Sequence, residues 1–270
     1  MKLISSLSIL LIFTACVHGN ENSFTGSTPA GPVVRTFLGI PLKDSVDFIR
    51  WNFVFNDGNF SLDCNYGVGQ PNTSGFWNGG KRISWKGKFQ KEKNCIQLWY
   101  EGRKLNLVML NQNLLHFADE NKNLLVGTGG WSYTLNNLAA SVSDQFNLSP
   151  TKIVLQDSMA FHGRTPCQGI DSRPECRKLK WSIVLFANPK TNQPTTFRIR
   201  GTTYNNEYKS GEWKINAGKD GRKIYELDFF ENRKPLYLLK LDDNNVIFTD
   251  EKGNLLVGDH DFSYSLSRKL

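Results

Sequence analysis

Four side chains that could bind a soft metal ion lie close together in the sequence, between positions 159 and 176. They are Met159, His162, Cys167 and Cys176. A thioether, an imidazole and thiolates together suit Cu(I). Oxidised cysteines cannot act as thiolate ligands, so a copper site and a disulfide between Cys167 and Cys176 exclude each other. We expect the disulfide, with Met159 buried and His162 on the surface.

The N-terminus indicates the compartment, and with it the redox state of these cysteines. The chain begins MKLISSLSILLIFTAC, in which one lysine precedes an uncharged apolar run that ends in small residues and Cys16. The run is too short to span a bilayer and is typical of an export signal. Its end resembles a bacterial lipobox, which predicts a lipoprotein signal peptide over 1–16 and stable anchoring through acylated Cys16. An ordinary secretory signal is the alternative.

Export also bears on the other cysteines. Apart from Cys16 the chain has four, an even number that favours disulfides in an oxidising compartment. Pairing between neighbours in the sequence joins Cys64 to Cys95 and Cys167 to Cys176, one of the three connectivities that four cysteines allow. Two free buried thiols are the alternative for Cys64 and Cys95.

An internal repeat indicates the elements that position these residues. FADENKNLLVG at 117–127 and FTDEKGNLLVG at 248–258 share eight of eleven residues at an offset of 131 positions. The central Asp, Asn and Gly are typical of a hairpin turn, and the flanking Phe and Leu residues are typical of a core. The phrase therefore predicts a structural element that closes a β unit. We expect Trp51 to correspond to Trp181, and Trp85 to Trp213, as core residues.

The rest of the chain shows a strand pattern. Short segments rich in Ile, Val, Phe, Tyr and Trp alternate with turns rich in Gly, Asn, Asp and Pro. Closure into a barrel removes exposed sheet edges. We therefore predict an all-β fold of two small antiparallel meander barrels in tandem. The predicted divisions are a signal peptide (1–16), a flexible tether (17–33), a first barrel (34–137), a linker (138–152) and a second barrel (153–270).

Composition and motifs argue against several functions. The net charge is +8, but Lys and Arg are scattered and no nucleic-acid fingerprint accompanies them. The sequence contains no Gly-x-Ser-x-Gly elbow and no His-Glu-x-x-His helix. Asp259-His260-Asp261 could serve acid–base or metal chemistry, but such a segment is more typical of a polar loop. We expect neither an enzyme nor a nucleic-acid partner.

One aromatic pair stands outside the repeat. Phe76 and Trp77 lie in a glycine-rich segment of the first half that has no equivalent in the second. An exposed pair of this kind can form a contact surface for a ligand or a partner protein. It can equally plug the mouth of a barrel, and both interpretations stay open.

Several landmarks in the second half occur in a characteristic order. They are Phe161-x-Gly163, Pro166-Cys167-x-Gly169, Gly211-x-Trp213 and Asp250-x-x-Gly253. In this order they resemble the N-terminal domain of the NlpE family, bacterial outer-membrane lipoproteins linked to copper resistance and surface sensing. The resemblance covers most of 155–268. It covers the first half only through the repeat, where FLGIPLKDS (37–45) keeps the Phe-x-Gly and the Pro.

This resemblance implies a lipocalin-like barrel on a lipid anchor, a link to copper and no catalysis. The family has a Cys-x-x-Cys at this place, whereas eight residues separate Cys167 from Cys176. The wider spacing is more typical of a disulfide than of a metal site.

Two functions follow as hypotheses. The first is a non-enzymatic outer-membrane lipoprotein, facing the periplasm or the cell surface, that takes part in envelope sensing through contacts with another envelope protein. The second is a lipocalin-like carrier of a small apolar ligand. Strand interiors rich in aromatic residues leave little room in so small a barrel, which favours the first hypothesis.

Overall fold

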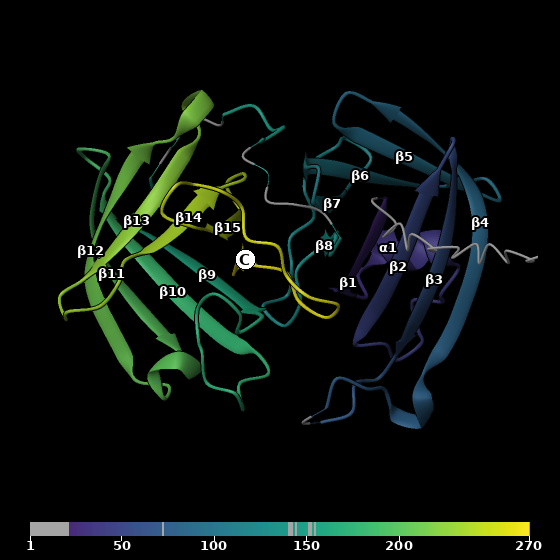
Figure 1. Cartoon of the computed structure of the whole chain (residues 1–270), viewed down its shortest axis with the longest axis horizontal. Helices are drawn as coiled ribbons and strands as arrows, with labels where there is room; N and C mark the ends of the chain where they lie inside the picture. Colours follow the sequence, from purple (N-terminus) through teal and green to yellow (C-terminus); the bar gives the residue numbers. More distant parts are fainter. Residues whose placement is uncertain are drawn as a thin grey trace, which may run out of the picture.

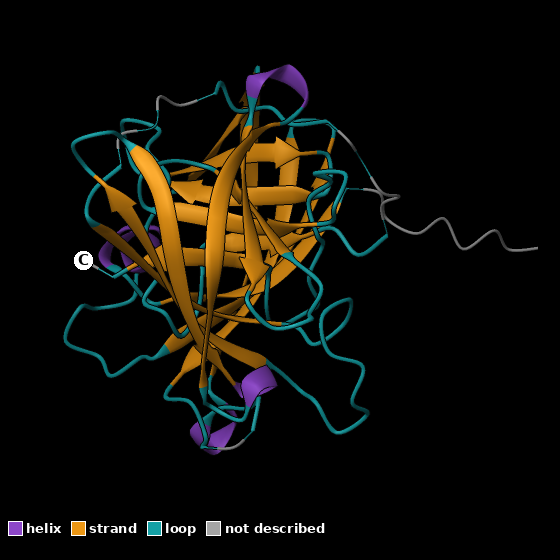
Figure 2. Cartoon of the chain, turned by 90° about the vertical axis from the view of Figure 1, so that its left-hand side faces the viewer, coloured by secondary structure: helices purple, strands orange, loops and turns teal. Residues whose placement is uncertain are grey.

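The computed structural model describes residues 22–71, 73–139, 143, 145–150, 153 and 155–269. Two closed antiparallel barrels of eight strands each follow one another along the chain, β1–β8 and then β9–β16 (Figure 1). The predicted all-β fold of two tandem barrels is confirmed. Strands make up most of both barrels, and the helices are short segments (Figure 2).

The first barrel contains one short α-helix and one 3-10 turn besides its strands. Its elements are β1 (Ser23–Pro29), α1 (Pro32–Leu38), β2 (Phe48–Asn56), β3 (Asn59–Gly67), η1 (Trp77–Gly79), β4 (Lys81–Glu92), β5 (Cys95–Tyr100), β6 (Arg103–Asn111), β7 (Leu114–Ala118) and β8 (Thr134–Asn136).

The second barrel repeats the strand order, and its described residues contain two 3-10 turns and no α-helix. Its elements are β9 (Ser158–Thr165), β10 (Leu179–Asn188), β11 (Gln193–Gly201), η2 (Thr202–Tyr204), β12 (Tyr208–Ala217), η3 (Lys219–Gly221), β13 (Lys223–Phe229), β14 (Leu236–Lys240), β15 (Asn245–Thr249) and β16 (Ser265–Arg268). Among the residues that the structure describes, no helix is both long and apolar enough to cross a membrane.

The two cores are built around the same tryptophan. Trp51 Nε1 donates a hydrogen bond of 2.8 Å to Thr28 Oγ1, and its ring lies 5.0 Å from that of Phe117. Trp181 Nε1 donates at the same distance to Thr165 Oγ1. Its ring also lies 5.0 Å from a phenylalanine, Phe248. The predicted equivalence of Trp51 and Trp181 is therefore confirmed.

The predicted tether over 17–33 is wrong for its described part, because that part contains β1 and the start of α1. β1 pairs along its whole length with β2 and closes the barrel against β8. It corresponds to β9, since Gly26 faces Trp51 just as Gly163 faces Trp181. The shared phrase is Phe-x-Gly-x-Thr-Pro at 24–29 and 161–166. The counterpart of this motif is thus 24–29 and not 37–45.

The phrase at 117–127 and 248–258 has the predicted structural role. Asp119 Oδ1 accepts hydrogen bonds from the backbone N–H groups of Asn121 and Asn123, and Asp250 Oδ1 does the same for Lys252 and Asn254. The predicted second strand of a hairpin is wrong, because only one isolated bridge follows each turn. The chain instead runs on toward the other barrel.

The segment that follows each turn contacts the other barrel, and the two sets of contacts are equivalent. Gly127 N–H donates to Ser267 Oγ at 2.8 Å, and Gly258 N–H donates to Asn136 Oδ1 at 2.8 Å. Gly127 and Gly258 are 131 positions apart, and so are Asn136 and Ser267. Equivalent residues thus exchange equivalent contacts, as in the interface of a two-fold symmetric dimer. The last loop of the second barrel (yellow) reaches the first barrel in Figure 1.

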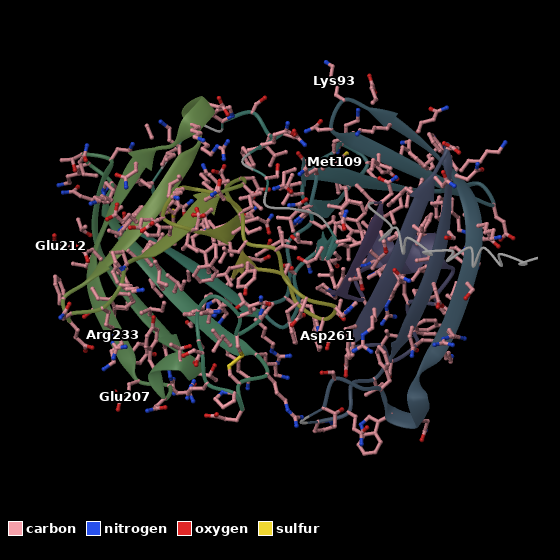
Figure 3. All side chains as sticks on the ribbon, in the orientation of Figure 1. Lys93, Met109, Glu207, Glu212, Arg233 and Asp261 are labelled. Atoms are coloured by element: carbon pink, nitrogen blue, oxygen red, sulfur yellow. A yellow bond between two sulfur atoms is a disulfide. The ribbon has the colours of Figure 1, made fainter. Side chains whose placement is uncertain are left out.

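The segment between the first two strands is held by different interactions in the two barrels. In the first barrel, the buried Arg35 guanidinium donates to the carbonyl oxygens of Ala30, Pro41, Leu42, Asp44 and Val46. In the second barrel, a disulfide joins Cys167 to Cys176 (yellow bond in Figure 3). The predicted disulfide is present.

Candidate functional site

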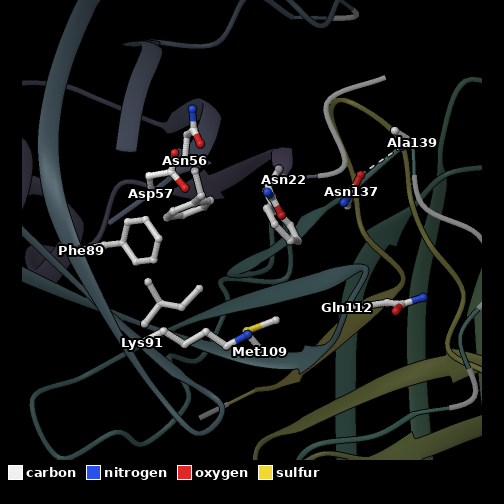
Figure 4. Close-up of a pocket in the computed structure, with 12 residues that line it drawn as sticks. Asn22, Asn56, Asp57, Phe89, Lys91, Met109, Gln112, Asn137 and Ala139 are labelled. Carbon is white, nitrogen blue, oxygen red and sulfur yellow. Dashed lines mark hydrogen bonds between the residues drawn. The ribbon is translucent and has the colours of Figure 1, made fainter. Parts of the chain in front are cut away.

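The first barrel has a cavity at its mouth, at the end opposite α1. Phe24, Phe55, Phe89, Ile96 and Met109 line its inner part, and the cavity has a volume of about 590 Å³. The rings of Phe55 and Phe89 meet edge to face at 5.1 Å. Phe89 and Met109 point toward the same open space in Figure 4. A volume of this size is typical of small-molecule sites, which span roughly 300–1,000 Å³.

Polar side chains surround the rim of this mouth. They are Asn22, Asn56, Asp57, Lys91, Gln112 and Asn137. An apolar interior with a polar rim is the arrangement in which a barrel holds a ligand with an apolar body and a polar end.

The mouth of the second barrel is largely filled. The strand register places Trp213 where the first barrel has Phe89, because Gly87 faces Phe60 as Gly211 faces Phe197. By the same register, Tyr225 takes the place of Ile96. These two larger rings pack against each other at 5.1 Å.

The remaining space in the second mouth is small. A cavity of about 200 Å³ is left, and Lys240 and Asp243 form an ion pair of 2.7 Å beside it. The two repeats therefore share one scaffold, and of the two mouths only the first has room for a ligand of ordinary size. The predicted equivalence of Trp85 and Trp213 is wrong, since Trp213 corresponds to Phe89.

The predicted copper ligands do not converge. Cys167 and Cys176 are oxidised to a disulfide. Met159 and His162 lie on the same strand, β9, but three residues apart, so they point to opposite faces of the sheet. Met159 is buried in the core, and His162 is half-buried on the outer face. Among the described residues, no cluster of three or more His, Cys, Asp or Glu side chains could hold a metal ion.

The predicted disulfide between Cys64 and Cys95 is wrong, because both thiols are free and buried. β4 lies between their strands. Cys64 pairs with Ile83 at one end of β4, and Cys95 pairs with Glu92 at the other. Nine residues along a strand separate the two cysteines by about 30 Å, far beyond the reach of a disulfide.

The aromatic pair at 76 and 77 is divided between two environments. Phe76 is buried and stacks on Phe48 at 4.2 Å, and Phe48 in turn stacks on Trp131 at 4.7 Å. Trp77 is 55% exposed. Phe76 therefore anchors the loop, and only Trp77 offers a contact surface. Neither residue lines the open mouth of the first barrel.

The polar segment Asp259–Asp261 has structural contacts. Asp259 Oδ1 accepts hydrogen bonds from the N–H groups of Asp261 and Phe262, which form a turn. Asp261 forms an ion pair of 2.6 Å with Arg50 of the first barrel, and its side chain lies at the junction of the barrels in Figure 3. These contacts confirm that the segment is a polar loop.

His116 is the most enclosed of the histidines that the structure describes. It lies on the outer face of β7 and is fully buried, and its partner Thr134 is hydrogen-bonded to Ser265 of the second barrel. Its Nε2 bonds to Leu125 O at 2.9 Å and its Nδ1 to Thr134 Oγ1 at 2.8 Å. Burial lowers the pKa of His116. A carbonyl accepts only, so Nε2 carries the proton and the neutral ring accepts from Thr134.

No family model, no curated protein and no solved structure matches this chain. Its function has therefore to be argued from its own geometry. Cys16, the predicted lipidation site, lies outside the described residues.

Sequence reasoning missed the residues that line the open mouth. Phe24 fell within the supposed tether, and Phe89, Ile96 and Met109 look like ordinary core residues in an apolar strand. The repeat did contain a signal, because the first half has smaller residues, Phe89 and Ile96, at the positions where the second half has Trp213 and Tyr225. It could be seen only after the strand register had aligned the two halves.

Proposed function

We propose that this protein is a non-enzymatic, lipid-anchored binding protein that holds a small apolar ligand, such as a fatty-acyl chain, in the mouth of its first barrel. The observation that supports this most directly is the difference between the two mouths. Where the second barrel has Trp213 and Tyr225, the first has Phe89 and Ile96 and a cavity of about 590 Å³. The carrier hypothesis thereby gains over the sensor hypothesis.

The position of the N-terminus supports an acyl ligand. Asn22 lies on the rim of the mouth. Cys16 is six positions earlier, a stretch that spans at most about 22 Å when fully extended. A lipid attached to Cys16 would therefore hold the mouth close to the membrane, which is a source of acyl chains.

A fluorescent fatty acid tests the ligand proposal. We expect a dansyl-labelled fatty acid to bind the wild type and to bind the double variant Phe89→Trp/Ile96→Tyr at least tenfold more weakly, because larger rings fill the cavity. Trp213→Phe, at the equivalent position of the second barrel, is the matched control and should bind as the wild type does. Equal binding by the wild type and the double variant would rule out this mouth as the site.

The anchor is tested separately. Cys16→Ser should move the protein from the membrane fraction to the soluble fraction or leave its signal uncleaved. If the variant stays in the membrane and still needs detergent for its extraction, the lipoprotein proposal is wrong.

Contact with an envelope protein is the second candidate function, and the exposed Trp77 supports it. A large aromatic side chain on a loop anchored by Phe76 is suited to insertion into a partner surface. Trp77→Ala should then abolish cross-linking to that partner in cells without changing fatty-acid binding. Unchanged cross-linking would remove this candidate.

A further inference from the structure

Another cavity, of about 580 Å³, lies at the seam between the barrels and is rich in cations. Its wall from the second barrel includes His162, Arg164, Lys180 and Lys269, and its wall from the first barrel is the loop 126–129. We call it the basic pocket. No carboxylate is among its described lining residues.

The cations of the basic pocket lie close to one another. Arg164 on β9 faces Lys180 on β10 directly in the strand register. Like charges that face each other across two strands are destabilising. Burial lowers the pKa of Lys178, the charges of Arg164 and Lys180 add to this effect, and the charge of Asp261 opposes it.

Within the described part of the chain, no ion pair neutralises Arg164, Lys180 or Lys269, which line the basic pocket. The guanidinium of Arg164 instead lies over the ring of Trp131, with its central carbon 5.1 Å from the ring centre. Burial lowers the pKa of Arg164 because it disfavours the charged guanidinium, and no neighbouring carboxylate opposes this effect. Burial and the charge of Lys269 likewise lower the pKa of His162. A partly buried cation without a counter-ion is costly, which raises the question of what supplies the negative charge.

The equivalent cavity on the other side of the seam supplies the comparison. It is lined by Thr25, Arg50, Asp63 and Asp261 among others, and has a volume of about 680 Å³. Arg50 corresponds to Lys180, because each directly precedes the core tryptophan of its barrel. Here the cation is neutralised, since Arg50 pairs with Asp261 at 2.6 Å.

Comparison of equivalent positions in the two repeats shows which residues make the charges of the two cavities different. Asp261 corresponds to Gly130, 131 positions earlier, so the basic pocket lacks this acid. Arg164 and His162 take the places of Ser27 and Thr25, so the pocket also gains two basic side chains. The charges of the cavity around Arg50 and Asp261 therefore balance, whereas the basic pocket keeps an excess of positive charge.

We propose that the basic pocket binds a small molecule that carries a phosphate group, with Arg164 and Lys180 as its principal ligands. The guanidinium fork of arginine matches phosphate geometry, and lysine adds a second charge. The phosphate could belong to a soluble metabolite or to a lipid headgroup. Binding at this pocket does not depend on the mouth of the first barrel.

Titration of the full chain with pyrophosphate, at low and constant ionic strength, tests the proposal. We expect measurable binding by the wild type, and a loss of tenfold or more in Arg164→Gln/Lys180→Gln, because the variant loses both charge-assisted hydrogen-bond donors to the phosphate. The matched control is Lys86→Gln/Lys88→Gln on the exposed face of β4, which makes the same change in net charge. The control variant should bind as the wild type does.

A second variant restores the acid that the other side of the seam has. In Gly130→Asp the atoms nearest to the new Cβ would be side-chain atoms, Thr128 Oγ1 at 3.7 Å and the Arg164 guanidinium at 3.9 Å. We expect its carboxylate to pair with Arg164 and to abolish pyrophosphate binding, with a melting temperature no lower than that of the wild type. Absent wild-type binding, binding retained by Gly130→Asp, or an equal loss in the Lys86/Lys88 control would each overturn the proposal.

Sedimentation with vesicles of phosphatidylcholine containing phosphatidylglycerol separates the two sources of phosphate. Vesicle binding that needs Arg164 and Lys180 identifies a lipid headgroup. Pyrophosphate binding without such vesicle binding identifies a soluble ligand.

Discussion

Ser132 and Ser263 are hydrogen-bonded through their side-chain hydroxyls at 2.6 Å, and they occupy equivalent positions of the two repeats, 131 residues apart. Thr134 and Ser265, also 131 residues apart, form the next such pair at 2.8 Å. A residue that touches its own counterpart lies on the axis relating the two barrels. The pseudo-two-fold axis therefore passes through both contacts, between the two members of each pair.

A double-mutant cycle tests this axis. Ser132→Ala and Ser263→Ala should each destabilise the protein by about 1 kcal/mol, because each leaves a buried hydroxyl without its partner. The double variant should lose less than the sum of the two, since it removes both hydroxyls. Urea unfolding of the four proteins measures this coupling, and strict additivity would contradict the contact.

His116 makes the stability of the seam depend on pH. Its ordinary pKa is 6.5, and burial lowers the pKa in the folded state. As the pH falls below 6.5 the unfolded chain takes up a proton that the folded chain resists, so the free energy of unfolding decreases. Protonated Nδ1 could no longer accept from Thr134. We expect His116→Gln to lose less stability than the wild type between neutral and mildly acidic pH.

Chemical denaturation at several pH values measures this effect. His162 has a lowered pKa as well, so His162→Gln is the necessary comparison. The carboxyl groups of Asp119 and Asp171 have lowered pKa values and titrate at more acidic pH, outside this window. Parallel stability curves for the wild type and His116→Gln would contradict the prediction.

The Cys167–Cys176 disulfide should stabilise the second barrel by about 2–3 kcal/mol, because the bond closes a short loop and restricts the unfolded chain. Cys167→Ala/Cys176→Ala should show this loss in urea unfolding. Reductant should lower the stability of the wild type to the level of the variant and leave the variant unchanged. A reductant effect on the variant would point to another disulfide.

Arg35 should stabilise the first barrel by at least as much as the Cys167–Cys176 disulfide stabilises the second. Arg35→Met keeps the apolar stem but removes the guanidinium donor from five carbonyl oxygens, of which that of Pro41 still accepts from Asp44 N–H, at an expected cost of about 3 kcal/mol or more. Arg82→Met, on an exposed part of β4, is the control and should change stability little. Reductant should lower the stability of Arg35→Met by the same amount as that of the wild type, because both keep the Cys167–Cys176 disulfide.

Cys64 should be unreactive in the folded protein. Burial, aided by the charge of Asp63, raises the pKa of Cys64 to about 12, and the thiolate is the reactive form. Iodoacetamide at neutral pH should therefore label Cys64 only after denaturation. Peptide mapping under non-reducing conditions checks the same point, because a peptide that links Cys64 to Cys95 would contradict the structure.

Sequence reasoning recovered the features that repeat at a single offset. The Trp51–Trp181 correspondence, the turns at Asp119 and Asp250 and the number of barrels all follow from phrases that recur about 131 positions apart. β1 was missed because its residues are small and polar, and because its repeat in β9 lies at an offset of 137. The difference arises from the longer segment between β1 and β2, which contains α1.

The candidate sites were harder to predict, for a physical reason. Both cavities are defined by differences between the halves, such as Ile96 against Tyr225 and Gly130 against Asp261. Single-residue differences carry no signal in a repeat search, and their meaning depends on the strand register. Cys64 and Cys95 show the same limit, since only the register reveals that β4 holds them apart.

The reciprocal seam has a consequence for stoichiometry. Two identical separate chains that met through these contacts would hold together only at sufficient concentration, and would show every site twice. Within one chain the two barrels are covalently linked, so each meets the other at an effective concentration in the millimolar range or above. Each half is also free to differ from the other. In the part of the chain that the structure describes, the proposed mouth and the proposed basic pocket each occur once, so each molecule would bind one copy of either ligand and would not cross-link two.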